Sequence, residues 1–183
     1  MTVLILHGIM GRAGENWGQW LHDECIKLGH KVIMPDLPKS DHPERREWLK
    51  IITNLLTPID DEIVVVGHSL AVTSILDYCE TSGKQIRAVV SVSGFYEPYG
   101  MELNDYFLKA KEIDIKKTKQ SISSLFAIYG DDDPYVPQST LRKTADDLGV
   151  EPVVVKNGGH LNKAAGFTTL PQVLDFISSL KPN

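Results

Sequence analysis

The sequence predicts an α/β protein built on a mostly parallel six-stranded sheet with helices on both faces. Short apolar runs rich in valine and isoleucine alternate along the chain with longer segments whose apolar residues are spaced three and four apart. Glycine and proline clusters separate the two kinds of segment. Runs that are apolar at every position are typical of strands buried on both faces, and such strands joined by helices form βαβ units.

Two strands and two helices are expected before the central strand. Each strand is a short apolar run, and each helix carries tryptophan and leucine residues at helical spacing. Gly29 ends the first helix, and Pro35 stops the second strand. In chain order these elements are a strand at 3–6, a helix at 15–28, a strand at 31–34 and a helix at 42–56.

The remaining elements begin with a strand at 63–66 that leads through a short turn into a helix at 72–79. Residues 95–121 break the regular alternation, so we expect them to form a short cap-like insertion within a single domain spanning 1–183. The further elements are strands at 86–93, 124–129 and 152–155, and helices around 102–112, 138–148 and 170–180.

Composition and charge exclude several classes of function. The chain of 183 residues is 42% hydrophobic and 23% charged, as in an ordinary soluble globular protein. A formal net charge of −5 without a basic stripe argues against nucleic-acid and anionic-membrane partners. No apolar stretch approaches the length of a membrane span, and the N-terminus lacks the basic region of a signal peptide. We therefore expect a cytoplasmic protein.

The two cysteines, Cys25 and Cys79, lie far apart in the chain and lack metal-ligand spacing. In a cytosolic protein they are read as buried reduced thiols, with a disulfide as the alternative. No metal and no organic cofactor are expected.

The turn Gly67-His68-Ser69-Leu70-Ala71 joins the central apolar run to a helical segment. A serine at the centre of such a sharp strand-to-helix turn is typical of a nucleophile held in a strained backbone conformation. Strand and helix then pass close at the positions two before and two after the serine, where Gly67 and Ala71 are small. Ser69 is the candidate nucleophile, and a helix N-cap is the alternative reading.

An acid and a histidine are expected beyond the ends of later strands, where functional groups of open parallel sheets gather. Asp131, Asp132 and Asp133 follow the fifth strand, and His160 follows the sixth. A serine nucleophile needs an imidazole to take its proton and a carboxylate to orient the imidazole. The order serine, acid, histidine is that of α/β-hydrolases. The residues alone do not separate the three aspartates, with Asp36 as a distant fourth and a surface role as the alternative for His160.

Two backbone N–H groups are expected to bind the oxyanion of a tetrahedral intermediate. They belong to Leu70, directly after the serine, and to Ile9, in the glycine-rich loop after the first strand. His7 and His68 lie in the same region and are expected to orient loops.

Together these residues resemble the family of small serine hydrolases that includes the YdeN proteins and the retinoblastoma-binding serine hydrolase. The resemblance runs nearly end to end and implies a single-domain α/β-hydrolase fold with a minimal cap. In such hydrolases the acid opens an Asp-x-x-Val-Pro stretch, which implies Asp133 here, with Asp131 as the alternative. The motifs are His7-Gly8 with Trp17 and Trp20, Met34-Pro35-Asp36-Leu37-Pro38 with Trp48-Leu49, Gly67-His68-Ser69-Leu70, Val92-Ser93-Gly94-Phe95, Asp133-Pro134-Tyr135-Val136-Pro137 and Gly159-His160-Leu161-Asn162.

The leading hypothesis is a hydrolase of carboxylic esters with small or short acyl groups, acting through an acyl-enzyme on Ser69. An amidase or thioesterase uses the same residues, a lyase or haloperoxidase-like enzyme would look similar, and a silent fold that binds a protein is the alternative of another class. Phe95, Tyr96, Tyr99 and Tyr135 are read either as pocket walls or as scaffold packing. The Leu-x-Cys-x-Glu motif of the eukaryotic relative is absent, so the protein partner is unknown.

Overall fold

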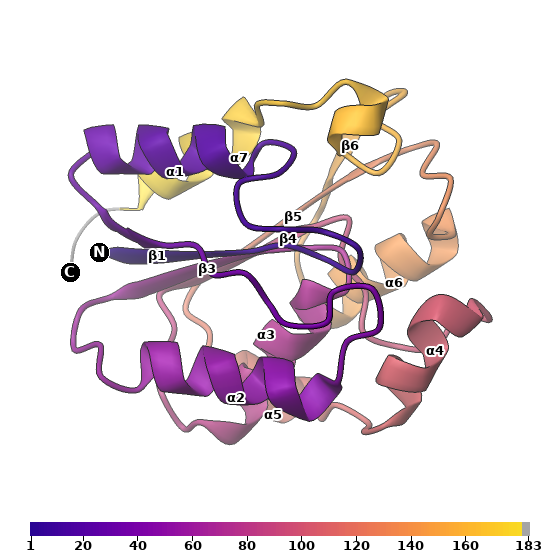
Figure 1. The fold of residues 1–183 in the computed structure, drawn as a ribbon, viewed down its shortest axis with the longest axis horizontal. Helices are drawn as coiled ribbons and strands as arrows, with labels where there is room; N and C mark the ends of the chain where they lie inside the picture. Colours follow the sequence, from indigo (N-terminus) through magenta and orange to yellow (C-terminus); the bar gives the residue numbers. More distant parts are fainter. Residues whose placement is uncertain (181–183) are drawn as a thin grey trace.

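The computed structural model describes residues 1–180, so the last three residues of the predicted 1–183 domain lie outside the described part. Its centre is a six-stranded sheet in the order β2-β1-β3-β4-β5-β6, parallel at every pairing (Figure 1). The predicted α/β sheet is therefore confirmed. The strands are β1 (Thr2–Leu6), β2 (Lys31–Ile33), β3 (Ile63–His68), β4 (Ala88–Val92), β5 (Leu125–Gly130) and β6 (Val153–Val155).

Helices fill the connections, and two of them begin three residues later than expected. Asn16 has a left-handed backbone with φ of 56°, which delays the first helix to Gly18, and Glu44 is extended, which delays the second to Arg45. Within residues 1–180 the helices are α1 (Gly18–Lys27), α2 (Arg45–Leu56), α3 (Ala71–Thr81), α4 (Glu102–Lys109), α5 (Ile115–Gln120), α6 (Gln138–Leu148) and α7 (Pro171–Ser179), with a 3-10 turn η1 (Lys163–Ala165).

The segment 95–121 holds two helices, where one was expected around 102–112. The Asp114 side chain accepts hydrogen bonds from the backbone N–H groups of Lys116 and Lys117, so it caps a second helix, α5, that is separate from α4. Only α4 lies beyond the carboxyl ends of the strands, whereas α5 runs below the sheet close to α3 (Figure 1). The part of this segment available to cover a site is therefore α4 and its approach.

Alternate residues of each central strand pack on opposite faces of the sheet. Val3 and Ile5 of β1 contact the cluster formed with α1 and α7, whereas Leu4 and Leu6 contact the cluster formed with α2 and α3. Figure 1 shows α1 and α7 on one side of the sheet and α2, α3 and α5 on the other. Burial on both faces explains why these strands are apolar at nearly every position.

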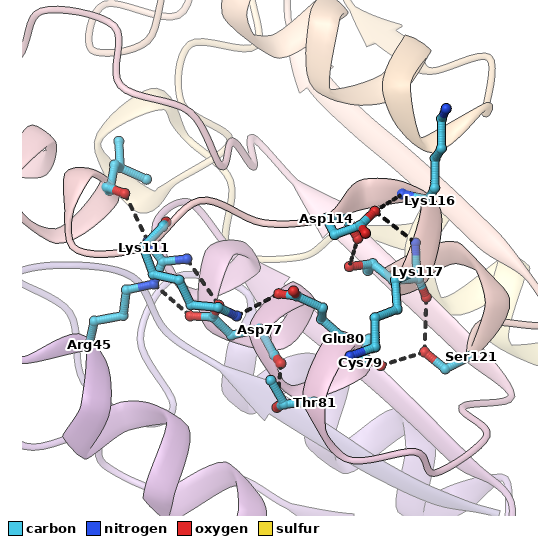
Figure 2. A network of polar contacts seen from close by, with 12 residues as sticks. Arg45, Asp77, Cys79, Glu80, Thr81, Lys111, Asp114, Lys116, Lys117 and Ser121 are labelled. Atoms are coloured by element: carbon cyan, nitrogen blue, oxygen red, sulfur yellow. Dashed lines mark hydrogen bonds and ion pairs between the residues drawn. The ribbon is translucent and has the colours of Figure 1, made fainter.

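Helix α4 is tied to the core by a buried ion pair (Figure 2). Arg45, at the start of α2, contacts Asp77 of α3 through Nε at 2.6 Å and Nη2 at 3.0 Å. Its Nη1 donates to the backbone carbonyls of Phe107 and Leu108, in the last turn of α4, and of Lys111, just after the helix. Since a buried charge needs such partners, this pair fixes where α4 crosses the carboxyl edge of the sheet.

Candidate active site

Ser69 lies on the turn between β3 and α3 with a left-handed backbone, φ 56°. Its N–H donates to Val92 O of β4 at 2.9 Å, which holds the turn against the neighbouring strand. A Cβ on Gly67 would come within 2.4 Å of Ile75 Cδ1 and 3.3 Å of Val72 N, so strand and helix pass closely at this small residue. The N-cap of α3 is Leu70, and no side chain caps this helix. The strained turn expected from the sequence is present, and the N-cap reading of Ser69 is wrong.

Asp133 is the aspartate that contacts His160. Its Oδ2 lies 2.6 Å from His160 Nδ1, and its side chain has no exposed surface. Its Oδ1 accepts the backbone N–H groups of Tyr135 at 2.9 Å and Val136 at 3.1 Å. A carboxylate only accepts hydrogen bonds, so Nδ1 of His160 carries the proton and Nε2 is left to accept another.

The two other aspartates hold the loop that carries the histidine. Asp131 Oδ1 accepts the N–H of Asn157, and Asp132 Oδ1 accepts the N–H of Gly159, both at 2.7 Å. Three neighbouring carboxylates therefore have three different partners. Among them only Asp133 is placed to orient an imidazole.

Close packing at the end of β5 determines the course of this loop. A Cβ on Gly130 would lie 2.3 Å from the carbonyl oxygen of Gly159, a backbone atom that has no freedom to rotate away. On the other side, Trp17 Nε1 donates to Leu161 O at 2.9 Å. The sequence placed Trp17 inside a helix, but it precedes α1 and braces the loop around His160.

His68 also fixes the histidine loop, as the sequence led us to expect. Its Nε2 lies 2.9 Å from the backbone oxygen of His160, and the two rings are 4.9 Å apart. A carbonyl oxygen only accepts, so His68 Nε2 carries a proton. Burial, and then the neighbouring His160, lower the pKa of His68 from 6.5 to about 3, so its ring stays neutral in the folded protein.

His7 orients the peptide that links Gly8 to Ile9. Its Nε2 accepts the N–H of Leu37 at 2.8 Å, so its proton is on Nδ1, which donates to Gly8 O at 2.9 Å. The N–H of Gly11 donates to the same oxygen at 3.2 Å. In a trans peptide the N–H points opposite to the carbonyl, so the Ile9 N–H points away from these donors.

The loop after β2 braces the same segment from outside. Ser40 O accepts the N–H of Met10 at 2.6 Å, and Asp36 Oδ1 accepts the N–H of Ala13 at 2.7 Å. Asp36 therefore belongs to the support of this loop and has no contact with His160 among the described residues.

The N–H groups of Ile9 and Leu70 donate no hydrogen bond to any residue in the range 1–180. A Cβ on Gly8 would come within 2.9 Å of Ser69 Cβ, so this loop lies directly against the serine. Unpaired donors beside a serine are the arrangement that stabilises negative charge on a reacting carbonyl oxygen.

Ser69, His68 and His160 line one cavity of about 330 Å³. Its other described lining residues come from the loop after β1, the start of α4, the loop after β5 and the loop after β6. They are Gly8, Ile9, Met10, Gly11, Glu15, Asn16, Met101, Leu103, Asn104, Tyr135, Val136 and Asn162.

The aromatic residues considered as pocket walls differ in position. Tyr135 lines the cavity, and its ring meets the His160 ring edge-on at 5.2 Å. Phe95 is fully buried and packs against Tyr99, and the buried Tyr96 donates to Asp147 of α6 at 2.6 Å. Among the described residues neither Phe95 nor Tyr96 lines the cavity, so both serve as packing. Sequence reasoning missed Met10 and Leu103, which carry no local motif.

Cys25 and Cys79 are free and buried, and burial raises the pKa of Cys25 to about 11 and of Cys79 to about 12, so both are inert thiols. Within residues 1–180 no three His, Cys, Asp or Glu side chains are grouped to hold a metal ion. None of the described helices has the length and apolar character needed to cross a membrane.

A parallel α/β sheet with a serine on a strained strand-to-helix turn, beside a histidine paired with an aspartate, defines the α/β-hydrolase class. The model of the serine hydrolase family matches residues 3–179, and the chain belongs to this family. The sequence is 27% identical over 180 residues to the hydrolase YdeN of Bacillus subtilis (strain 168), covering 97% of this chain and 94% of that protein. It is 22% identical over 152 residues to the serine hydrolase RBBP9 of Rattus norvegicus, covering 81% and 79%.

Solved structures agree with this assignment. The crystal structure of the ydeN gene product from B. subtilis superposes with a TM-score of 0.91 at 26% identity, covering 98% of this chain and 97% of that one. A monoacylglycerol lipase from Paleococcus ferrophilus superposes with a TM-score of 0.69 at 16% identity, covering 98% and 95%, which shows a shared fold. The resemblance stated from the sequence motifs is confirmed.

Proposed function

We propose that this serine hydrolase cleaves carboxylic esters of short acyl groups through an acyl-enzyme on Ser69. His160 Nε2 takes the serine proton as the oxygen attacks the ester carbonyl, and then gives it to the leaving alcohol. Asp133 holds the imidazole in the required tautomer and stabilises its cation. Water, activated by His160, then releases the acid and restores Ser69.

The observation that carries this proposal is the contact, at 2.6 Å, between the buried side chain of Asp133 and His160, which lines the same cavity as Ser69. A buried carboxylate stays in a fold when it has strong partners, and here these are one imidazole and two backbone N–H groups. This arrangement leaves Nε2 of His160 without a proton and able to accept one.

The unpaired N–H groups of Ile9 and Leu70 support the acyl-transfer part of the proposal. Two fixed donors beside the serine stabilise the oxyanion of the tetrahedral intermediate, and each such donor contributes about 10²–10³ in kcat in enzymes of this kind. The His7 ring keeps the Gly8 carbonyl turned away, so the donor from Ile9 needs no rearrangement during the reaction.

The test is labelling of the purified protein with a fluorophosphonate probe, mapped by mass spectrometry and followed by hydrolysis of p-nitrophenyl acetate. We expect label on Ser69 in the wild type, no label in Ser69→Ala and strongly reduced label in His160→Ala. Ser74→Ala serves as the matched control, since this serine is buried in α3 and lies outside the cavity lining.

The outcomes separate the alternatives. Label on Ser69 together with ester turnover supports the proposal. Label on Ser69 without ester turnover, but with turnover of a matched anilide or thioester, would change the proposed substrate from an ester to an amide or thioester. A folded protein that takes no label would favour a silent hydrolase fold that acts by binding.

A further inference from the structure

The cavity around Ser69 is rimmed by apolar side chains that the fold leaves exposed. Among the described residues the large exposed hydrophobic side chains are Met10, Ile26, Leu28, Leu103, Tyr135, Val153 and Val154. Three of these line this cavity, with exposed fractions of 65% for Met10, 45% for Leu103 and 49% for Tyr135. Exposed apolar surface gathered on a concave site indicates a hydrophobic ligand.

These three side chains come from three separate elements. Met10 belongs to the loop after β1, Leu103 to the first turn of α4, and Tyr135 to the loop after β5. Figure 1 shows α4 beyond the carboxyl ends of the strands, where these loops also lie. The Arg45 ion pair holds the C-terminal end of α4 in place, so Leu103 is presented on an anchored helix rather than on a free loop.

The three residues differ in their distance from the reacting groups. Tyr135 packs edge-on against His160, and His160 returns its proton to the leaving oxygen, so the leaving group lies on the Tyr135 side. Met10 directly follows Ile9, the proposed oxyanion donor, and Leu103 lines the cavity from α4, a different element from the loop that carries Tyr135. Met10 and Leu103 are therefore left for the acyl side of an ester.

Charge excludes one kind of acyl group. Within residues 1–180 no lysine or arginine lines the cavity. In this part of the chain its one lining carboxylate is that of Glu15, and its other polar side chains include asparagines and two histidines. A carboxylate at the end of an acyl chain would lose water beside Met10 and Leu103 without gaining a cation as partner.

We propose that Met10 and Leu103 form the binding site for a short, uncharged acyl chain of the substrate. This assignment rests on the proposed function, since it places the carbonyl carbon of the ester at Ser69. Thioether and leucine side chains adapt to chains of different length, so the site selects for apolar character and tolerates a range of lengths.

The test compares three esters with one leaving group: p-nitrophenyl acetate, p-nitrophenyl hexanoate and mono-p-nitrophenyl adipate. Full burial of a methylene raises kcat/KM about fourfold, which corresponds to about 0.8 kcal/mol. Since Met10 and Leu103 cover only part of the chain, we expect kcat/KM to rise about twofold per methylene, so that hexanoate, with four more methylenes, lies about fifteenfold above acetate. Adipate, which has the same chain length with a terminal carboxylate, should fall about tenfold below hexanoate.

Two variants test whether the acyl chain of the substrate contacts Leu103. Leu103→Ala should lower the ratio of hexanoate to acetate about threefold, because it removes part of the apolar wall. Leu103→Lys should raise the ratio of adipate to hexanoate severalfold, and added salt should weaken this gain. Leu28 is the matched control, since it is 48% exposed and lies outside the cavity lining, so Leu28→Ala and Leu28→Lys should leave both ratios unchanged.

Several results would overturn the assignment. Equal rates for acetate, hexanoate and adipate, or equal effects at Leu103 and Leu28, would refute the acyl site while leaving ester hydrolysis at Ser69 intact. Dependence on chain length in a series of alkyl acetates, with none in the acyl series, would move the apolar chain to the leaving group. Absence of turnover for every ester, with no fluorophosphonate label on Ser69, would remove the proposed function and this site together.

Discussion

Replacement of each of the three adjacent aspartates by asparagine tests the central contact of the proposed mechanism. Asp133 uses Oδ1 for two backbone N–H groups and Oδ2 for His160. In Asp133→Asn the remaining oxygen still accepts both backbone N–H groups, so the local fold is retained. The new amide N–H, however, faces His160 Nδ1, where the wild-type imidazole also carries its proton.

The imidazole relieves this conflict by moving its proton to Nε2, which then has no lone pair for the serine proton. In serine hydrolases this change of tautomer lowers kcat about 10⁴-fold, which is about 5 kcal/mol in the barrier. Asp131 and Asp132 each accept one backbone N–H, which an asparagine oxygen also accepts. Asp131→Asn and Asp132→Asn should therefore lose less than about tenfold.

The assay is the initial rate of p-nitrophenyl acetate hydrolysis together with the rate of fluorophosphonate labelling, and urea unfolding checks that each variant is folded. Asp133→Asn with more than a tenth of wild-type activity would refute the assignment of the acid. An equally severe loss in Asp131→Asn would transfer the role to that residue.

Three further predictions follow from buried contacts. Arg45→Met should lower the free energy of unfolding in urea by about 3–5 kcal/mol, because within residues 1–180 the Asp77 carboxylate keeps only Lys111 as a partner and three backbone carbonyls at the end of α4 and just after it lose their donor. Arg46→Met, at an exposed neighbouring position, should change it by less than about 0.5 kcal/mol, and similar values for the two variants would contradict the role of Arg45. Gly130→Ala should slow labelling of Ser69 about 10²-fold, because the added Cβ displaces the loop that carries His160. In the control Gly18→Ala the added Cβ meets only Met34 Sδ at 3.5 Å, and labelling should be unchanged. Normal labelling in both variants would contradict the requirement for a glycine at position 130. In the unfolded chain His68 binds a proton below about pH 6.5, whereas in the folded protein its pKa is about 3 and the ring stays neutral. The free energy of unfolding should therefore fall as the pH drops from about 6.5 to about 3. Between about pH 7 and about pH 4.5 this loss is at most about 3 kcal/mol. It should be absent in His68→Asn and present in His22→Asn. Parallel curves of unfolding free energy against pH for the wild type and His68→Asn would contradict this prediction.

Much of the fold follows from local patterns in the sequence. Six apolar runs predicted six strands. Burial on both faces explains the apolar runs of the inner strands, whereas the edge strands β2 and β6 are apolar although they are partly exposed. The element ends were less accurate where a single residue leaves the helical region, as at Asn16 before α1 and at Asp114 before α5. Such conformations depend on one side chain or one φ angle, which a periodic pattern does not register.

Two residues of the candidate site could be recognised from the sequence. Ser69 was recognised from the sequence because its conformation is a local property, set by the strand before it, the helix after it and the small residue at 67. His160 was recognised because the carboxyl ends of parallel strands meet at one edge of the sheet.

The sequence by itself thus determined the sheet, the order of its elements and the turn that carries the serine. Only the tertiary structure decided which of three adjacent aspartates contacts the histidine, because the three share the same local preferences and differ only in what loop 157–160 brings to them. Met10 and Leu103 were found in the same way, since nothing in their own segments indicates a shared cavity. Local conformation is encoded by neighbours in the chain, whereas contacts between distant loops depend on how β5, β6 and α4 are packed.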